Sequence, residues 1–158
     1  CTFDDHFFDV HDQALFKEAG GGITPWHADQ YYWPLSSDNT ITAWIPLQET
    51  PLEMGPLEFS AGSHRITEGR DLSIGDESEA IMTKKLRVTD FPHSIEAFDA
   101  GEISFHSGWV FHRAGANTTD KIRKVMTIIY MDKDIFYHEN SIEIHCIIIN
   151  SNENIQEL

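Results

Sequence analysis

The segment Thr24-Pro25-Trp26-His27-Ala28-Asp29 holds the most informative pattern in the chain, a histidine and an aspartate separated by one residue. Side chains at positions i and i+2 of an extended segment lie on the same side of the chain. His27 and Asp29 can therefore bind one metal ion together if this segment is extended. A third ligand must come from elsewhere, and two imidazoles with one carboxylate form the facial arrangement of non-haem Fe(II) oxygenases.

Further motifs follow this pair in a fixed order. They are Gly20 to Gln30 around the pair itself, Thr42-Ala43-Trp44-Ile45-Pro46-Leu47, Gly55 to Ser60, the turn Ala61-Gly62-Ser63-His64, Gly101 to His106, the string Phe111-His112-Arg113-Ala114-Gly115-Ala116-Asn117, and Arg123. From about residue 12 to about residue 131, this ordered set resembles the phytanoyl-CoA dioxygenase family of Fe(II)- and 2-oxoglutarate-dependent oxygenases.

The resemblance implies a role for six residues. His27, Asp29 and His112 would bind Fe(II). Arg123 would bind the distal carboxylate of the co-substrate 2-oxoglutarate, since the planar guanidinium makes two parallel hydrogen bonds and stays charged when buried. Trp44 would lie beside the co-substrate, and Gln13 would touch it. The remaining co-substrate is O2, and the products of the keto acid are succinate and CO2.

Two positions bear on the reaction. Residue 114 is Ala where many family members carry a Ser that helps to hold the keto acid, so Arg123 lacks that hydroxyl. Asp29 is present, whereas halogenating relatives have a small residue there so that a halide can bind iron. The resemblance therefore implies hydroxylation of a small organic substrate rather than halogenation. We expect His106 to lie in the core or beside the metal ligands, and not to bind the metal.

Short alternating runs predict an all-β fold, a double-stranded β-helix or jelly roll with few short helices. The predicted strands are Gln13 to Phe16, Thr42 to Leu47, Leu57 to Phe59, Ile103 to His106, Val110 to Ala114, Ile122 to Met131 and Ile142 to Ile149. Strand periodicity places His112 and Ala114 on one face, and Arg123, Val125 and Thr127 on one face of the next strand. The side chains of His112 and Arg123 can then point into one cavity.

The charged segment from Ile66 to Phe91 allows two interpretations. It is either a lid over the barrel mouth or a solvated surface loop with a short helix. Family members normally carry helices before the point at which this chain, starting at Cys1, enters the pattern. We therefore expect residues 1–158 to be a single oxygenase-core domain that is truncated at its N-terminus and lacks the family's helical part.

The composition limits the possible partners and location. The formal net charge of −15 disfavours nucleic acid and anionic membranes as partners, because both bind clustered Lys and Arg. No apolar run approaches the roughly 18 residues of a membrane span. Two distant cysteines, Cys1 and Cys146, argue against a disulfide framework. These features favour a cytoplasmic protein with a small-molecule substrate, and they leave the oligomeric state open.

Two alternatives to the oxygenase remain. The same fold could bind another metal or keto acid, as a cupin-like isomerase or hydrolase does, although the spacing of Arg123 from His112 argues against this. A non-catalytic jelly roll that binds a metabolite is the other alternative, and Ala114 is the residue that favours it.

Overall fold

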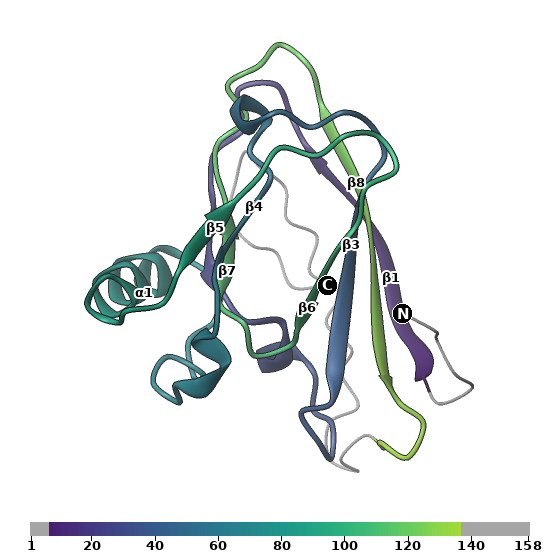
Figure 1. Cartoon of the computed structure of the whole chain (residues 1–158), viewed down its shortest axis with the longest axis vertical. Coiled ribbons are helices and arrows are strands. Elements are labelled where there is room, and N and C mark those ends of the chain that lie inside the picture. The colour runs from purple at the N-terminus through teal and green to yellow at the C-terminus, as the bar shows by residue number, and fades with distance from the viewer. Residues whose placement is uncertain (1–6, 137–158) are drawn as a thin grey trace.

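The computed structural model describes residues 7–136, which form two antiparallel four-stranded sheets that face each other (Figure 1). The first sheet has the order β1 (Phe7–Lys17), β8 (Arg123–Asp132), β3 (Thr40–Pro46) and β6 (Ser104–Ser107). The second has the order β2 (Thr24–His27), β7 (His112–Ala114), β4 (Leu57–Ser60) and β5 (His93–Ile95). The predicted all-β jelly-roll class is confirmed.

The helices of the described region are one α-helix and three short 3-10 turns. They are α1 (Asp76–Val88), η1 (Asp29–Tyr32), η2 (Leu52–Met54) and η3 (Ser63–Arg65). None is long and apolar enough to cross a membrane, as far as residues 7–136 show.

Six predicted strands overlap observed ones, and the seventh, Ile142 to Ile149, lies outside the described residues. β2 and the three-residue β5 were not predicted as strands. Alternate side chains of β8 point inward, as the periodicity of the strand predicts. Lys124 is exposed, whereas the buried residues are Arg123, Val125, Thr127 and Ile129. These inward side chains form one wall of the space between the sheets.

Most of the charged segment lies away from this space. Its helix α1 lies against the outer side of the second sheet (Figure 1), where Met82 is fully buried and packs with Trp26 and Phe111. The lid interpretation is therefore wrong for the helix. Of residues 66–91, Ile74 alone lines the cavity between the sheets.

Candidate metal and co-substrate site

Three potential metal ligands converge at one end of the cavity. The ligand atoms of His27, Asp29 and His112 all lie within 4.8 Å of one another. Asp29 Oδ1 is 3.7 Å from His27 Nε2 and 3.5 Å from His112 Nε2. The structure thus brings together the three residues that the sequence singled out.

Two of the ligands lie on strands of the second sheet, and the third follows one of these strands. His27 ends β2 and His112 begins β7, and the two are direct partners in the antiparallel pairing of these strands. Asp29 is not on a strand, because it is the first residue of η1. The intervening Ala28 has φ −127° and ψ 128°, so the chain is still extended there. Asp29 therefore reaches the same side as His27.

Both histidines present an unprotonated Nε2 to the cavity. His27 Nδ1–H donates to the backbone carbonyl of Pro25 at 2.7 Å, and His112 Nδ1–H donates to that of Val110 at 3.0 Å. A hydrogen bond at one ring nitrogen fixes the tautomer and leaves the other free for a metal. Burial also lowers the pKa of both imidazoles, that of His112 well below its ordinary value, so the rings are neutral at pH 7.

The carboxyl of Asp29 is ionised. Burial alone would raise its pKa, but the neighbouring His112 and the hydrogen bond from His106 outweigh burial and lower the pKa below its ordinary value. Two neutral imidazoles and one carboxylate suit a divalent metal such as Fe(II) and leave a net positive charge on the complex. Such a centre attracts an anionic chelating ligand.

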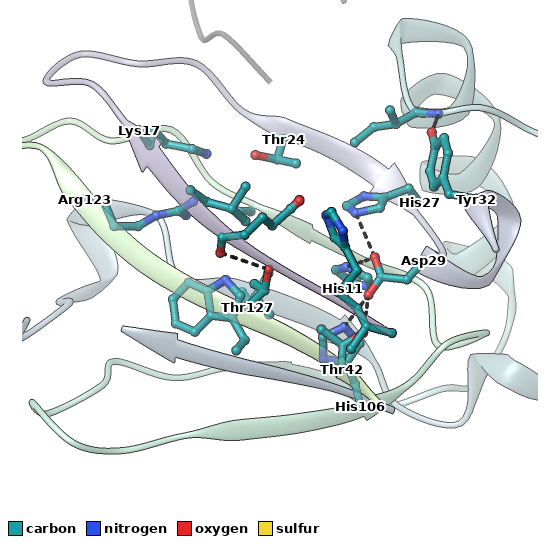
Figure 2. A pocket seen from close by; sticks show the side chains of 18 of the residues that line it. His11, Lys17, Thr24, His27, Asp29, Tyr32, Thr42, His106, Arg123 and Thr127 are labelled. Carbon is teal, nitrogen blue, oxygen red and sulfur yellow. Dashed lines mark hydrogen bonds and ion pairs between the residues drawn. The ribbon is translucent and has the colours of Figure 1, made fainter. Parts of the chain in front are cut away.

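Two cations line the opposite end of the same cavity (Figure 2). Arg123 is 4% exposed, its Nη1 donates to the backbone carbonyl of Gly55, and its guanidinium carbon lies 5.5 Å from the Trp44 ring centroid. Its Nε is buried without a hydrogen-bond partner in the part of the chain that the structure describes. Burial lowers the pKa of Arg123 to about 10, which keeps it charged at neutral pH.

The second cation, Lys17, was missed in the sequence. It is 4% exposed, and Nζ donates to the carbonyl of Gly115 at 2.6 Å. Burial and the nearby Arg123 lower its pKa to about 7. Strand parity could have found it, because Gln13, Leu15 and Lys17 alternate along one face of β1 and all line the cavity.

The other predicted co-substrate residues also line the cavity. Trp44 is 2% exposed and packs against Phe98 at 5.0 Å between ring centroids. Gln13 lines the cavity opposite Thr127, whose hydroxyl donates to the Gln13 backbone carbonyl at 3.4 Å. Ala114 lines the same wall as His112 and leaves no side-chain hydroxyl there.

The donor set fits a metal and a dianion. Within residues 7–136, neither Lys17 nor Arg123 has a carboxylate partner at ion-pair distance, and Arg123 Nε is unpaired. Buried cations without a counter-charge are costly, so an anion that enters this end stabilises them. A keto acid with one carboxylate here and its keto-carboxylate group at the metal would satisfy both ends.

The fold and the site together place this chain among the jelly-roll proteins that have a metal centre of two histidines and one carboxylate. Within that class, the chain belongs to the phytanoyl-CoA dioxygenase (PhyH) family, whose model matches residues 4–125.

Curated relatives agree with this family. One is the phytanoyl-CoA dioxygenase domain-containing protein 1 homolog of Caenorhabditis briggsae, 29% identical over 136 residues, which cover 78% of this chain and 46% of the relative. Another is the probable alpha-ketoglutarate-dependent hypophosphite dioxygenase of Stutzerimonas stutzeri, 26% identical over 130 residues, with 79% and 46% covered. The chain thus spans about half the length of these relatives.

Solved structures show the same fold. The epimerase SnoN from nogalamycin biosynthesis, in complex with Fe3+, alpha ketoglutarate and nogalamycin RO, is 26% identical with a TM-score of 0.73, over 97% of this chain and 62% of SnoN. The alpha ketoglutarate-dependent carbocyclase SnoK is 30% identical with a TM-score of 0.72, over 84% of this chain and 53% of SnoK. These relatives carry out different reactions on one architecture.

Proposed function

We propose that this domain is the core of an Fe(II)- and 2-oxoglutarate-dependent dioxygenase that hydroxylates a small organic substrate. The observation that supports this most directly is the pairing of His27, Asp29 and His112 at one end of a cavity with the buried cations at the other end. Iron in such a site supplies the chemistry by which one atom of O2 enters a C–H bond while the other converts 2-oxoglutarate to succinate and CO2.

The residues of the chain bind and orient the co-substrate in this proposal. Arg123 and Lys17 hold the distal carboxylate of 2-oxoglutarate, and Lys17 partly replaces the hydroxyl that Ala114 lacks. Trp44, which lies beneath the Arg123 guanidinium, and Gln13 border the carbon chain of the keto acid. The burial of these groups keeps water away from the carboxylate, which strengthens its hydrogen bonds to the two cations.

Hydroxylation is the outcome that Asp29 supports. Halogenating relatives have a small residue where this chain has Asp29, so that a halide can bind iron. With Asp29 present, the protein would supply three ligands, and the remaining positions on the metal would serve the co-substrate and O2. The epimerase and carbocyclase among the relatives use the same architecture, and their reactions are the competing outcomes of the test.

Two measurements test the proposal. Under argon, addition of 2-oxoglutarate to the Fe(II)-loaded protein should produce a weak visible absorption band, and this band should be absent in Arg123→Leu. In air and chloride, the protein should release succinate in an oxygen-dependent reaction, slowly in the absence of a primary substrate. Mass spectrometry of a product with one added oxygen supports hydroxylation, whereas a chlorinated product contradicts it. A folded, Fe(II)-loaded protein that gives neither band nor succinate would favour the non-catalytic metabolite-binding alternative.

A further inference from the structure

The two oxygens of Asp29 have different surroundings. Oδ1 faces the Nε2 atoms of His27 and His112, at 3.7 and 3.5 Å. Oδ2 points away from them and accepts two hydrogen bonds, from Thr42 Oγ1 at 2.6 Å and from His106 Nε2–H at 3.2 Å (Figure 2). One oxygen is therefore free for a metal while the other is held by the protein.

The donors to Oδ2 come from the opposite sheet. Thr42 on β3 and His106 on β6 are direct partners in the antiparallel register of the first sheet, and both are buried, at 4% and 6% exposed. Asp29 comes from the loop that follows β2 in the second sheet. A slip of β6 by one residue against β3 would turn His106 out of the cavity, whereas Thr42 would keep its position because β3 is also paired with β8.

The direction of the hydrogen bond between His106 and Asp29 follows from the carboxylate. An ionised carboxylate only accepts hydrogen bonds, so Nε2 of His106 carries the proton that it shares with Asp29. Nδ1 of His106 is buried without a partner within residues 7–136, and its nitrogens fall outside the set of ligand atoms within 4.8 Å of one another. His106 is thus placed as a donor to Asp29 and not as a fourth ligand.

We propose that Thr42 and His106 are positioning residues that hold Asp29 in a one-oxygen binding mode. This inference rests on the proposed function. If Oδ2 were free, the carboxylate could rotate and give both oxygens to the metal. The second oxygen would then occupy a coordination position that a chelating keto acid needs. The cross-strand pair therefore keeps the metal open for the co-substrate.

The test uses Co(II) in place of Fe(II), because Co(II) absorbs in the visible region and its band intensity falls as the coordination number rises. Thr42→Val keeps the shape of the side chain but removes the shorter hydrogen bond to Oδ2. We expect it to change the Co(II) spectrum and to weaken 2-oxoglutarate binding to the Co(II)-loaded protein by about 10- to 100-fold, the range for residues that orient metal ligands. Thr42→Ser, which keeps the hydroxyl, should restore both.

Thr40→Val is the matched control. Thr40 lies two residues earlier on β3, is 5% exposed, and donates its hydroxyl to Gln30 Oε1 at 2.5 Å instead of to the carboxylate. We expect the wild-type spectrum and affinity for it. His106→Gln, which keeps an N–H donor, should lose less affinity than His106→Leu.

The outcomes separate this inference from the proposed function. A wild-type protein that binds Co(II) and 2-oxoglutarate, with Thr42→Val unchanged in spectrum and affinity, would overturn the positioning role alone. Equal effects of Thr40→Val and Thr42→Val would also overturn it, since a general loss of packing would then explain both. A wild-type protein that binds neither metal nor keto acid contradicts the proposed function itself.

Discussion

Lys17 and Arg123 stand directly opposite each other in the antiparallel pairing of β1 with β8. Like charges in a cross-strand pair destabilise a sheet, and here both are buried. The pair is tolerated because Lys17 donates to the Gly115 carbonyl and because its lowered pKa of about 7 reduces its charge when no ligand is present. A dianion removes the conflict, which makes this pair a sensitive reporter of co-substrate binding.

Replacement of Arg123 tests the co-substrate anchor. We expect Arg123→Leu to weaken 2-oxoglutarate binding to the metal-loaded protein by at least about 30-fold, since a buried charge pair contributes on the order of 2 to 5 kcal/mol. Metal content should stay near normal, because Arg123 is at the far end of the cavity from the ligands. A calorimetric titration measures the first quantity and elemental analysis the second. Unchanged affinity would show that another cation binds the keto acid.

The lowered pKa of Lys17 predicts that the affinity for 2-oxoglutarate depends on pH. In the free protein it loses its proton as the pH rises through about 7, whereas the bound dianion favours the protonated form. The dissociation constant for 2-oxoglutarate should therefore rise between pH 6.5 and 8.5, by up to about tenfold per pH unit. Titrations of the Zn(II)-loaded protein at several pH values measure this. Lys17→Met should bind more weakly at low pH and show a flat profile; an unchanged slope would contradict the assignment.

The same shift predicts a stability change in the ligand-free protein. A lysine whose folded pKa is about 7 instead of 10.5 binds fewer protons in the folded state than in the unfolded state between these values. The free energy of unfolding contributed by this group therefore rises with pH across that window and is lowest below pH 7. Comparison of wild type with Lys17→Met in denaturant titrations at pH 6.5 and 9 isolates the contribution.

Removal of His112 tests the metal site. His112→Ala deletes one of three protein ligands, so we expect a large loss of Fe(II) from the dialysed protein, with a ratio well below one metal per chain. His64→Ala is the matched control, because His64 is exposed on η3 and lies outside the cavity. Metal analysis of both variants decides the matter: full occupancy in His112→Ala means that the ion binds elsewhere.

The backbone conformation of Gly55 affects the position of Arg123, because the Gly55 carbonyl accepts a hydrogen bond from that side chain. It has φ 69°, its carbonyl accepts from Arg123, and an added Cβ would lie 2.2 Å from the Gly115 carbonyl oxygen. Gly20 has a similar φ of 72° but nothing within 4 Å of an added Cβ. Both Ala variants should bear the left-handed strain of roughly 1 to 2 kcal/mol. Gly55→Ala should cost clearly more and should also weaken 2-oxoglutarate binding; equal thermal melting of the two variants would refute the close contact.

The sequence predicted the parts of the site that depend on local geometry. The two-residue spacing of His27 and Asp29 and the parity of Arg123 along β8 are properties of single segments, and the structure places these side chains as expected. The pairing of Thr42 with His106 depends on register between strands that are more than sixty residues apart, which no local pattern encodes. The turn of the chain into η1 after Ala28 was not predicted either, because only an extended segment was considered at Asp29.

The sequence also did not predict where α1 packs. Its charged residues indicated a solvated segment, but Met82 and Leu86 are buried against Trp26 of β2 and Phe111 on the outer side of the second sheet. Short amphipathic helices show which face is apolar and not which surface of the fold that face will cover. β5 was missed because three residues are too few for an alternating pattern.

Arg113 connects helix α1 to the strand that carries His112. It lies between His112 and Ala114 on β7, and its guanidinium bonds to Glu79 on α1 at 2.7 Å, while the other carboxylate oxygen of Glu79 accepts from the Trp26 backbone N–H at 2.9 Å. The helix is thus tied to both histidine-bearing strands. If an ion bound by His27 and His112 stabilises these two strands, local opening of α1 and release of that ion are linked, and the linkage is reciprocal. Metal loading should slow amide hydrogen exchange in a helix that never touches the ion.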